Sequence, residues 1–159
     1  MIFVTVATHF LGFERLIKEM DRIAAITNEE VIAQVGYTKY IPKNMKFFTF
    51  TEEEKLLELY KNSRIIVTHA GAGTLLTIFN YKKPVIVVPR LKHFNEHIDN
   101  HQLELAEVME KQKNVIVVYD IKTLEDALIR VEKLNYDEFK QNDTLVLFLK
   151  KTIQEMMNG

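Results

Sequence analysis

Residues 67–74, Val67-Thr68-His69-Ala70-Gly71-Ala72-Gly73-Thr74, follow a short β-branched run and precede an apolar pattern that suits a helix. The expected order is therefore strand, glycine turn, helix. The two glycines let the backbone approach a ligand closely, and the free N–H groups at a helix start attract an anion, typically a phosphate. A plain β–α turn that needs glycine for its dihedral angles is the competing interpretation.

A second strand pattern at residues 84–90 leads into a polar segment at residues 96–102, which holds Asn100, His101 and Gln102. Neutral amides and an acid near a phosphate site suit sugar hydroxyls, which need matched donors and acceptors. A solvated helix start is the competing interpretation. Together with the glycine turn, the segment indicates a nucleotide-sugar site.

The bulk composition narrows the class of protein. The 159 residues fit one domain, 47% are hydrophobic and 27% are charged, and the formal net charge of -1 gives no basic field for nucleic acid. The absence of cysteine excludes disulfides and thiolate chemistry. No apolar run approaches the roughly 20 residues that a membrane span needs, and no signal peptide is visible, so we expect a cytoplasmic protein.

Strand-like runs alternate with helical patterns along the chain. The runs are rich in Val, Ile and Phe without polar alternation, which is typical of a parallel sheet covered on both faces. We predict a Rossmann-like, doubly wound α/β fold in a single domain, residues 1–159. The expected strands are residues 2–6, 31–35, 46–50, 64–68, 85–88 and 115–118, and the expected helices are residues 13–26, 52–61, 74–81, 96–112, 122–134 and 143–157.

In such a fold, ligands bind at the carboxyl ends of the strands, near the point where the strand order reverses. The turns after Val6, Val67 and Val88 open there. A dinucleotide fingerprint follows the first strand and needs a third glycine, whereas this turn follows the fourth strand and has Leu76 in that place. NAD binding is therefore disfavoured.

Three histidines, His93, His97 and His101, recur every four residues, which on one helix would place them on one face. Three ligands spread over about 12 Å of helix axis cannot converge on one ion. We therefore expect these histidines to form no metal site. We also expect no tightly bound cofactor and no requirement for a divalent ion, because helix-start amides would stabilise the phosphates instead.

Three other side chains belong to the expected ligand edge. His9 ends the first strand pattern and would be a base, an anion contact or a packed loop residue. His69 directly follows a strand and would shape the glycine turn. Arg90 would either pair with a phosphate in bidentate fashion or hold a carboxylate such as Glu96.

The expected last helix, residues 143–157, is apolar on more than one side. Core packing explains such a pattern, and so does docking on a partner. We expect this helix to contact a membrane-bound subunit, or a second copy of the chain, through Leu145, Phe148, Leu149, Ile153 and Met156.

Four segments together resemble the C-terminal domain of family 28 glycosyltransferases, which have the two-domain GT-B fold. They are residues 4–9, 68–74, 87–90 and 100–106. The chain resembles the stand-alone members in particular. These are the soluble subunit of the eukaryotic UDP-GlcNAc transferase that acts on dolichol-linked GlcNAc, and subunits of bacterial polysaccharide-biosynthesis transferases.

The resemblance implies roles for the glycine turn and the helix that follows it. The amides around Gly71, Ala72, Gly73 and Thr74 would hold the donor diphosphate. In the peptidoglycan GlcNAc transferase, a glutamate of this helix binds the ribose, and Thr77 takes its position here.

The resemblance also implies roles for the polar segment and for the first turn. Gln102, with Asn100 and His101, would bind sugar hydroxyls. Thr8 and His9 would line the other side of the cleft.

The resemblance implies a donor-binding subunit of a two-component, inverting glycosyltransferase that moves a sugar from a UDP-sugar to a lipid-linked saccharide. A second, membrane-associated polypeptide would bind the acceptor and supply the catalytic base. If the base instead lies in this chain, His9 is the candidate. The chain would lie at the membrane through that partner, or pair with a second copy when alone. The alternative is a nucleotide-binding module that enhances a separate transferase without turnover of its own.

Overall fold

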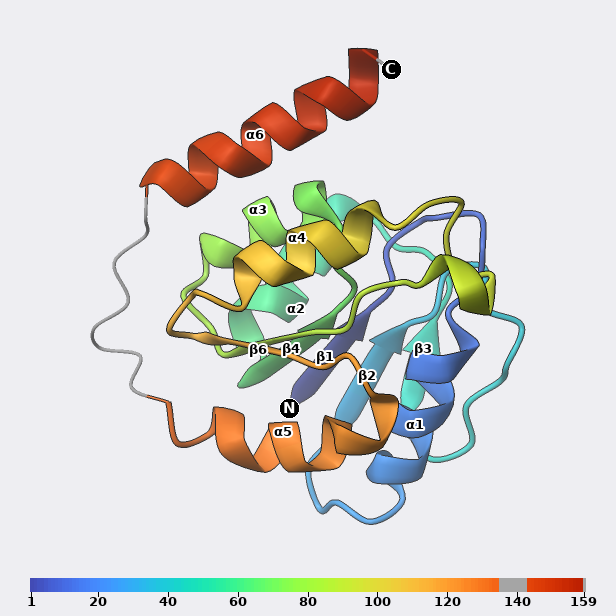
Figure 1. The fold of residues 1–159 in the computed structure, drawn as a ribbon. Coiled ribbons are helices and arrows are strands. Elements are labelled where there is room, and N and C mark those ends of the chain that lie inside the picture. The colour runs from blue at the N-terminus through green and yellow to red at the C-terminus, as the bar shows by residue number, and fades with distance from the viewer. Residues whose placement is uncertain (135–142, 159) are drawn as a thin grey trace.

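A parallel sheet runs through the middle of the molecule (Figure 1). The computed structural model describes residues 1–134 and 143–158, and the side chains of the last helix from residue 145 onward. Within these ranges six strands pair in the order β3-β2-β1-β4-β5-β6. They are β1 (Ile2–Thr5), β2 (Val31–Gln34), β3 (Lys46–Phe48), β4 (Ile65–Thr68), β5 (Val85–Val87) and β6 (Val115–Val117).

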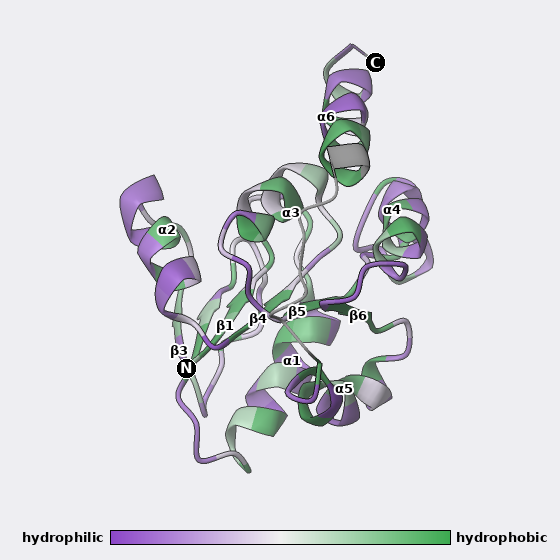
Figure 2. Cartoon of the chain, turned by 90° about the vertical axis from the view of Figure 1, so that its left-hand side faces the viewer, coloured by the Kyte–Doolittle hydropathy of each residue, from purple (hydrophilic) through white to green (hydrophobic). Residues whose placement is uncertain are grey.

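Helices cover both faces of this sheet, as Figure 2 shows. One face carries α1 (Glu14–Ala24) and α5 (Leu124–Val131). The other face carries α2 (Glu53–Asn62), α3 (Ala72–Phe79), α4 (His101–Met109) and α6 (Asp143–Asn158). Two short 3₁₀ helices, η1 (Lys92–Phe94) and η2 (Ile121–Thr123), complete the described elements.

The central strands are apolar because both of their faces are covered. Every residue of β1, β4 and β5 is buried. Along β1, Ile2 and Val4 face the core under α1 and α5, whereas Phe3 faces the core under α3 and α4. This burial on two sides explains why the sequence shows continuous β-branched runs instead of alternation. The predicted doubly wound, Rossmann-like fold is confirmed.

The strand order reverses between β1 and β4, which places the ligand edge at their carboxyl ends. β1 pairs with β2 on one side and with β4 on the other. The turns that follow β1, β4 and β5 therefore lie next to one another, as the sequence predicts.

The prediction of one helix over residues 96–112 is wrong at its start, because α4 begins only at His101. Asn95 adopts a left-handed conformation with φ of 57°, and the Glu96 carboxylate turns inward to accept a hydrogen bond from the Leu91 N–H. The chain then bends until Asp99 accepts a hydrogen bond from the His101 N–H. His93 and His97 consequently do not share a helix face with His101.

The last helix, α6, packs against α3 and contributes to the core on that side of the sheet. Leu145 and Leu149 are 4% and 0% exposed, and Ile153 is half-buried against the same cluster. The expectation that Leu145 and Leu149 contact a partner is therefore wrong, since this chain already buries both. The uncovered apolar part of the helix consists of Leu147, Phe148, Met156 and Met157, with exposed fractions of 38–82%.

Among the described helices, none has both the length and the apolar content that crossing a bilayer demands.

Candidate functional site

The glycine turn between β4 and α3 is built around the buried side chain of His69, which is 5% exposed. The Gln102 side-chain amide lies 3.0 Å from His69 Nδ1, and Thr74 Oγ1 lies 3.3 Å from His69 Nε2. An amide N–H donor at Nδ1 places the imidazole proton on Nε2, which then donates to Thr74. Burial lowers the pKa of His69 to about 3, and the positive charge of Arg90 acts in the same direction.

The lack of a side chain has a different consequence at each of the two glycines of the turn. A Cβ on Gly71 would lie 2.1 Å from Cε1 of His69, so this glycine makes room for the imidazole. A Cβ on Gly73 would meet nothing within 4 Å, because this residue faces open space at the start of α3. Only Gly73 therefore leaves the backbone accessible to a ligand.

The start of α3 is free to bind an anion. Gly71 is its N-cap residue, and no side chain of the described residues caps it. Ala72 is 5% exposed and packs inward, whereas Gly73 is exposed and Thr74 is half-buried. Thr77, one turn further, donates its hydroxyl hydrogen to the Gly73 carbonyl oxygen at 3.2 Å. The first-turn N–H groups of α3 thus lie at the ligand edge of the sheet, and no side-chain cap of the described residues competes for them.

The turn after β1 lies beside the glycine turn, because β1 and β4 are paired. Ala7 has φ of 55°, a left-handed conformation that glycine adopts at lower cost. Its N–H donates to the Thr5 hydroxyl at 3.1 Å. A Cβ on Gly36 would lie 2.7 Å from the Ala7 carbonyl oxygen, so the loop after β2 closely supports this turn. Thr8 follows as an exposed residue.

His9 is half-buried beside His97, with ring centroids 4.6 Å apart. The Leu11 N–H donates to Nδ1 of His9 at 3.1 Å, which leaves the proton of the neutral ring on Nε2. Burial lowers the pKa of His9, and the charges of Arg90 and His97 add to this effect. The neutral His9 ring therefore has Nε2–H as its hydrogen-bond donor, since its acceptor nitrogen is already used.

Arg90 lies in the interior with 0% exposure. Its Nη1 donates to the carbonyl oxygens of Leu11, Gly12 and Glu96 at 2.9, 3.2 and 3.1 Å. Its Nη2 donates to the Val6 carbonyl oxygen at 2.8 Å. The guanidinium thus ties the turn after β1 to the loop after β5, and it has no free face for a bidentate phosphate.

The second interpretation of Arg90, a partner for the Glu96 carboxylate, is also not what the structure shows. That carboxylate accepts hydrogen bonds from Arg15 Nε and Nη2 at 3.0 and 2.9 Å. Arg15 Nη2 also donates to the Pro89 carbonyl oxygen at 3.0 Å. Arg15 was not identified from the sequence, because nothing in its local pattern distinguishes it from a solvated helix residue.

Gln102 joins the other two turns. Its Oε1 accepts hydrogen bonds from the backbone N–H groups of Ala70 and Arg90 at 3.1 and 3.0 Å, and its Nε2 contacts His69. The side chain is 6% exposed. Gln102 therefore positions the glycine turn against the loop after β5, and a sugar contact would reach only its remaining amide hydrogen.

Asn100 and His101 lie at the exposed start of α4. Asn100 is its N-cap residue, and its Oδ1 accepts a hydrogen bond from the Lys92 N–H at 3.4 Å. The His101 ring lies 3.6 Å from a carboxylate oxygen of Asp99 and 3.4 Å from one of Glu104. Both residues are accessible to a ligand at the ligand edge.

Two aromatic side chains at the same edge were not predicted. Tyr37 and Phe50 follow β2 and β3, are 55% and 45% exposed, and contact edge-to-face with centroids 5.1 Å apart. The Gly36-Tyr37 pair directly after a strand pattern is the signal from which this position could have been found. Within the described residues, no group of three or more metal-ligating side chains is close enough to hold an ion.

A Rossmann-like sheet with an open glycine turn at its switch point is the arrangement found in one half of GT-B glycosyltransferases. A profile of the glycosyltransferase family 28 C-terminal domain matches residues 1–156, and the chain belongs to this family of transferases.

Two relatives illustrate the similarity in sequence. The human UDP-N-acetylglucosamine transferase subunit ALG13 is 30% identical over 122 residues, which cover 70% of this chain and 10% of that protein. The UDP-N-acetylglucosamine--N-acetylmuramyl-(pentapeptide) pyrophosphoryl-undecaprenol N-acetylglucosamine transferase of Prochlorococcus marinus (strain MIT 9312) is 26% identical over 150 residues, covering 90% and 38%. The chain thus spans between a tenth and about two fifths of the length of these relatives.

Solved structures show the same fold at low sequence identity. The glycotransferase of kitacinnamycin superposes with a TM-score of 0.64 at 14% identity, over 99% of this chain and 39% of that one. MurG of Acinetobacter baumannii gives 0.57 at 15% identity, over 93% and 44%. In both cases the chain corresponds to less than half of a GT-B enzyme.

The two glycines should respond differently to alanine. Gly71→Ala should lower the free energy of unfolding by about 1–3 kcal/mol, because the new Cβ displaces the His69 ring from its two partners. Gly73→Ala should leave stability unchanged or raise it by up to about 1 kcal/mol, since alanine favours a helix. Urea unfolding of both variants measures the contrast, and equal losses would contradict this account.

The stability of the protein should depend on pH through His69. The unfolded imidazole has a pKa of about 6.5, whereas the folded pKa is lowered to about 3. The unfolded state therefore binds a proton that the native state lacks, and stability declines as the pH falls from about 6.5 toward 3, by at most about 1.4 kcal/mol per pH unit. Unfolding free energies at pH 7.0 and 5.0 should differ less in His69→Asn than in the wild type. An equal difference in the two proteins would show that His69 does not contribute.

Proposed function

We propose that the chain is the donor-binding subunit of a two-component glycosyltransferase that uses a UDP-sugar. The observation that carries this proposal is the uncapped start of α3, where Gly73 faces open space beside the switch point of the sheet. The names of two relatives, both UDP-N-acetylglucosamine transferases or their subunits, support the choice of a uridine nucleotide.

The donor diphosphate would bind to the first-turn N–H groups of α3. Oriented N–H groups stabilise the negative charge that develops on a diphosphate leaving group, and they need no reorganisation during the reaction. The positive charge of Arg90 lies behind this turn and lowers the pKa of both His9 and His69. The electrostatic field of Arg90 would therefore favour an anion at the ligand edge without direct contact.

The remaining parts of the donor would lie on either side of the diphosphate. The exposed rings of Tyr37 and Phe50 offer an apolar surface for the uracil base. Thr77 would lie near the ribose, and Asn100 and His101 near the sugar.

The reaction would proceed with inversion at the anomeric carbon of the sugar. An acceptor oxygen attacks this carbon, the bond to the diphosphate oxygen breaks, and a general base takes the acceptor proton. His9 has only Nε2–H left to donate, so it would serve as a donor to the diphosphate while the partner supplies the base.

The acceptor half would come from a second polypeptide that lies at the membrane and binds a lipid-linked saccharide. The fold matches 39% and 44% of two such transferase structures, and the acceptor half is the part that this match does not include. The uncovered apolar residues Leu147 and Met157 on α6 are the proposed contact with that partner. A cytoplasmic, membrane-peripheral location follows from this arrangement.

Ligand binding to the purified chain tests the proposal. UDP-sugars at millimolar concentration should raise the melting temperature more than NAD or ATP, and a ligand at one hundred times its Kd adds about 2.7 kcal/mol of stability. Gly73→Val should abolish this shift and keep the fold, because the valine side chain would occupy the open space above the helix start. Gly73→Ala is the matched control for helix stability. A larger shift with NAD than with any UDP-sugar would exclude the proposed donor.

If α6 contacts the partner, substitutions on its exposed face and on its buried face should have different effects. Leu147→Asp combined with Met157→Asp should leave the domain folded but remove it from membranes of cells that contain the partner. Leu149→Asp should instead unfold the chain, since this side chain is fully buried. Membrane fractionation and circular dichroism measure the two effects. Retention of the folded double variant on membranes would place the partner contact elsewhere.

A further inference from the structure

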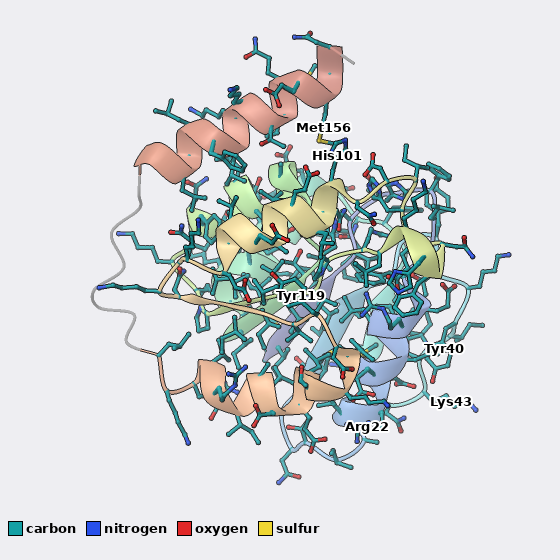
Figure 3. The ribbon with its side chains drawn as sticks, viewed as in Figure 1. Arg22, Tyr40, Lys43, His101, Tyr119 and Met156 are labelled. Atoms are coloured by element: carbon teal, nitrogen blue, oxygen red, sulfur yellow. The ribbon has the colours of Figure 1, made fainter. Side chains whose placement is uncertain are left out.

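A groove of about 300 Å³ lies between α4 and α6, on the side of the sheet that carries the glycine turn. Figure 3 shows the side chains of His101 and Met156 directed toward each other across it. The first two turns of α4 form one wall, and the second half of α6 forms the other. The lining residues are His101, Glu104, Leu105, Phe148, Thr152, Glu155 and Met156.

This groove is next to the candidate donor site. Gln102, which follows His101 on α4, bonds directly to the Ala70 N–H and to His69 of the glycine turn. α6 packs on α3, the helix that starts at the ligand edge. Figure 1 shows the C-terminal half of α6 above the beginning of α4. The groove and the glycine turn are thus connected through two consecutive residues of α4, His101 and Gln102.

The side chains of the groove match the chemistry of a neutral sugar. Leu105, Phe148 and Met156 supply apolar surface for the C–H groups of a pyranose ring. Two carboxylates, Glu104 and Glu155, supply acceptors for hydroxyl hydrogens. Their side chains are 77% and 68% exposed, and one oxygen of each lies 3.4 Å from His101 Nδ1 and 3.9 Å from Lys151 Nζ, respectively. Each carboxylate has a second oxygen that can accept from a ligand.

We propose that this groove receives the sugar ring of the nucleotide-sugar donor, with Glu155 and Thr152 of α6 contacting its hydroxyls. The inference rests on the proposed function and extends it, because it makes α6 part of the sugar subsite. Two carboxylates repel a third, so the groove selects neutral hexoses and N-acetylhexosamines against uronic acids.

Binding constants for UDP, UDP-GlcNAc, UDP-glucose and UDP-glucuronic acid test the inference on the purified full chain. The wild type should bind at least one of the two neutral UDP-sugars more tightly than UDP, and UDP-glucuronic acid more weakly than the neutral sugars. Glu155→Gln should weaken the preferred neutral UDP-sugar about fivefold or more, leave UDP unchanged and reduce the discrimination against UDP-glucuronic acid.

Glu107→Gln is the matched control, since Glu107 is an exposed carboxylate of α4 that does not line the groove. Thr152→Val, a second variant in the groove, should also weaken the neutral UDP-sugar and spare UDP. If UDP binds but neither variant changes the preference for the sugar, the inference is overturned and the proposed function stands. If neither UDP nor any UDP-sugar binds the wild type, the proposed function fails and the inference fails with it.

Discussion

The buried guanidinium of Arg90 holds together the edge of the sheet on which the site depends. It donates to four backbone carbonyl oxygens, three of which lie 78 to 84 residues earlier in the chain, whereas the fourth lies in the loop that follows β5. Backbone carbonyls in an irregular turn need donors when they are buried, and unpaired ones cost about 1–3 kcal/mol each. One side chain here satisfies several of them, so the turns after β1 and β5 are fixed relative to each other.

Gln102 extends the same arrangement to the glycine turn. Its Oε1 accepts from the N–H of Ala70 and from the N–H of Arg90, and its amide nitrogen holds His69. Gly71 then makes room for His69, and Gly73 remains open to a ligand. The rigid part of the turn, at Gly71, and the accessible part, at Gly73, thus lie two residues apart. A preorganised set of N–H groups is what a diphosphate leaving group requires, since charge stabilisation is strongest where dipoles are already oriented.

Local patterns in the sequence were sufficient for the fold and for the position of the ligand edge. The β-branched runs locate five of the six described strands, because strands covered on both faces leave no polar alternation. The sixth, β3, is the edge strand Lys46–Phe48, which is largely exposed and has no β-branched residue. The glycine turn was identifiable because the two glycines lie between a strand pattern and a helix pattern. The roles of Arg90 and Gln102 were not identifiable, because their partners are distant in sequence and a polar residue near a ligand edge also suits a ligand contact.

Two further differences have the same origin in tertiary contacts. α4 begins at His101 and not at the predicted residue 96, because the Arg15–Glu96 ion pair holds the preceding segment against the core. One face of α6 joins the core because Leu145 and Leu149 fit against the cluster around α3. In both cases the helix was predicted from its own residues, whereas its boundary or its buried face depends on another element.

A crystal structure of the chain with a bound UDP-sugar tests the central claim most directly. We expect the diphosphate within hydrogen-bond distance of the N–H groups of Gly73 and Thr74, with the Arg90 guanidinium still bonded to the carbonyl oxygens of Val6 and Leu11. A diphosphate bound away from the start of α3, or an Arg90 side chain turned outward to contact it, would contradict the account.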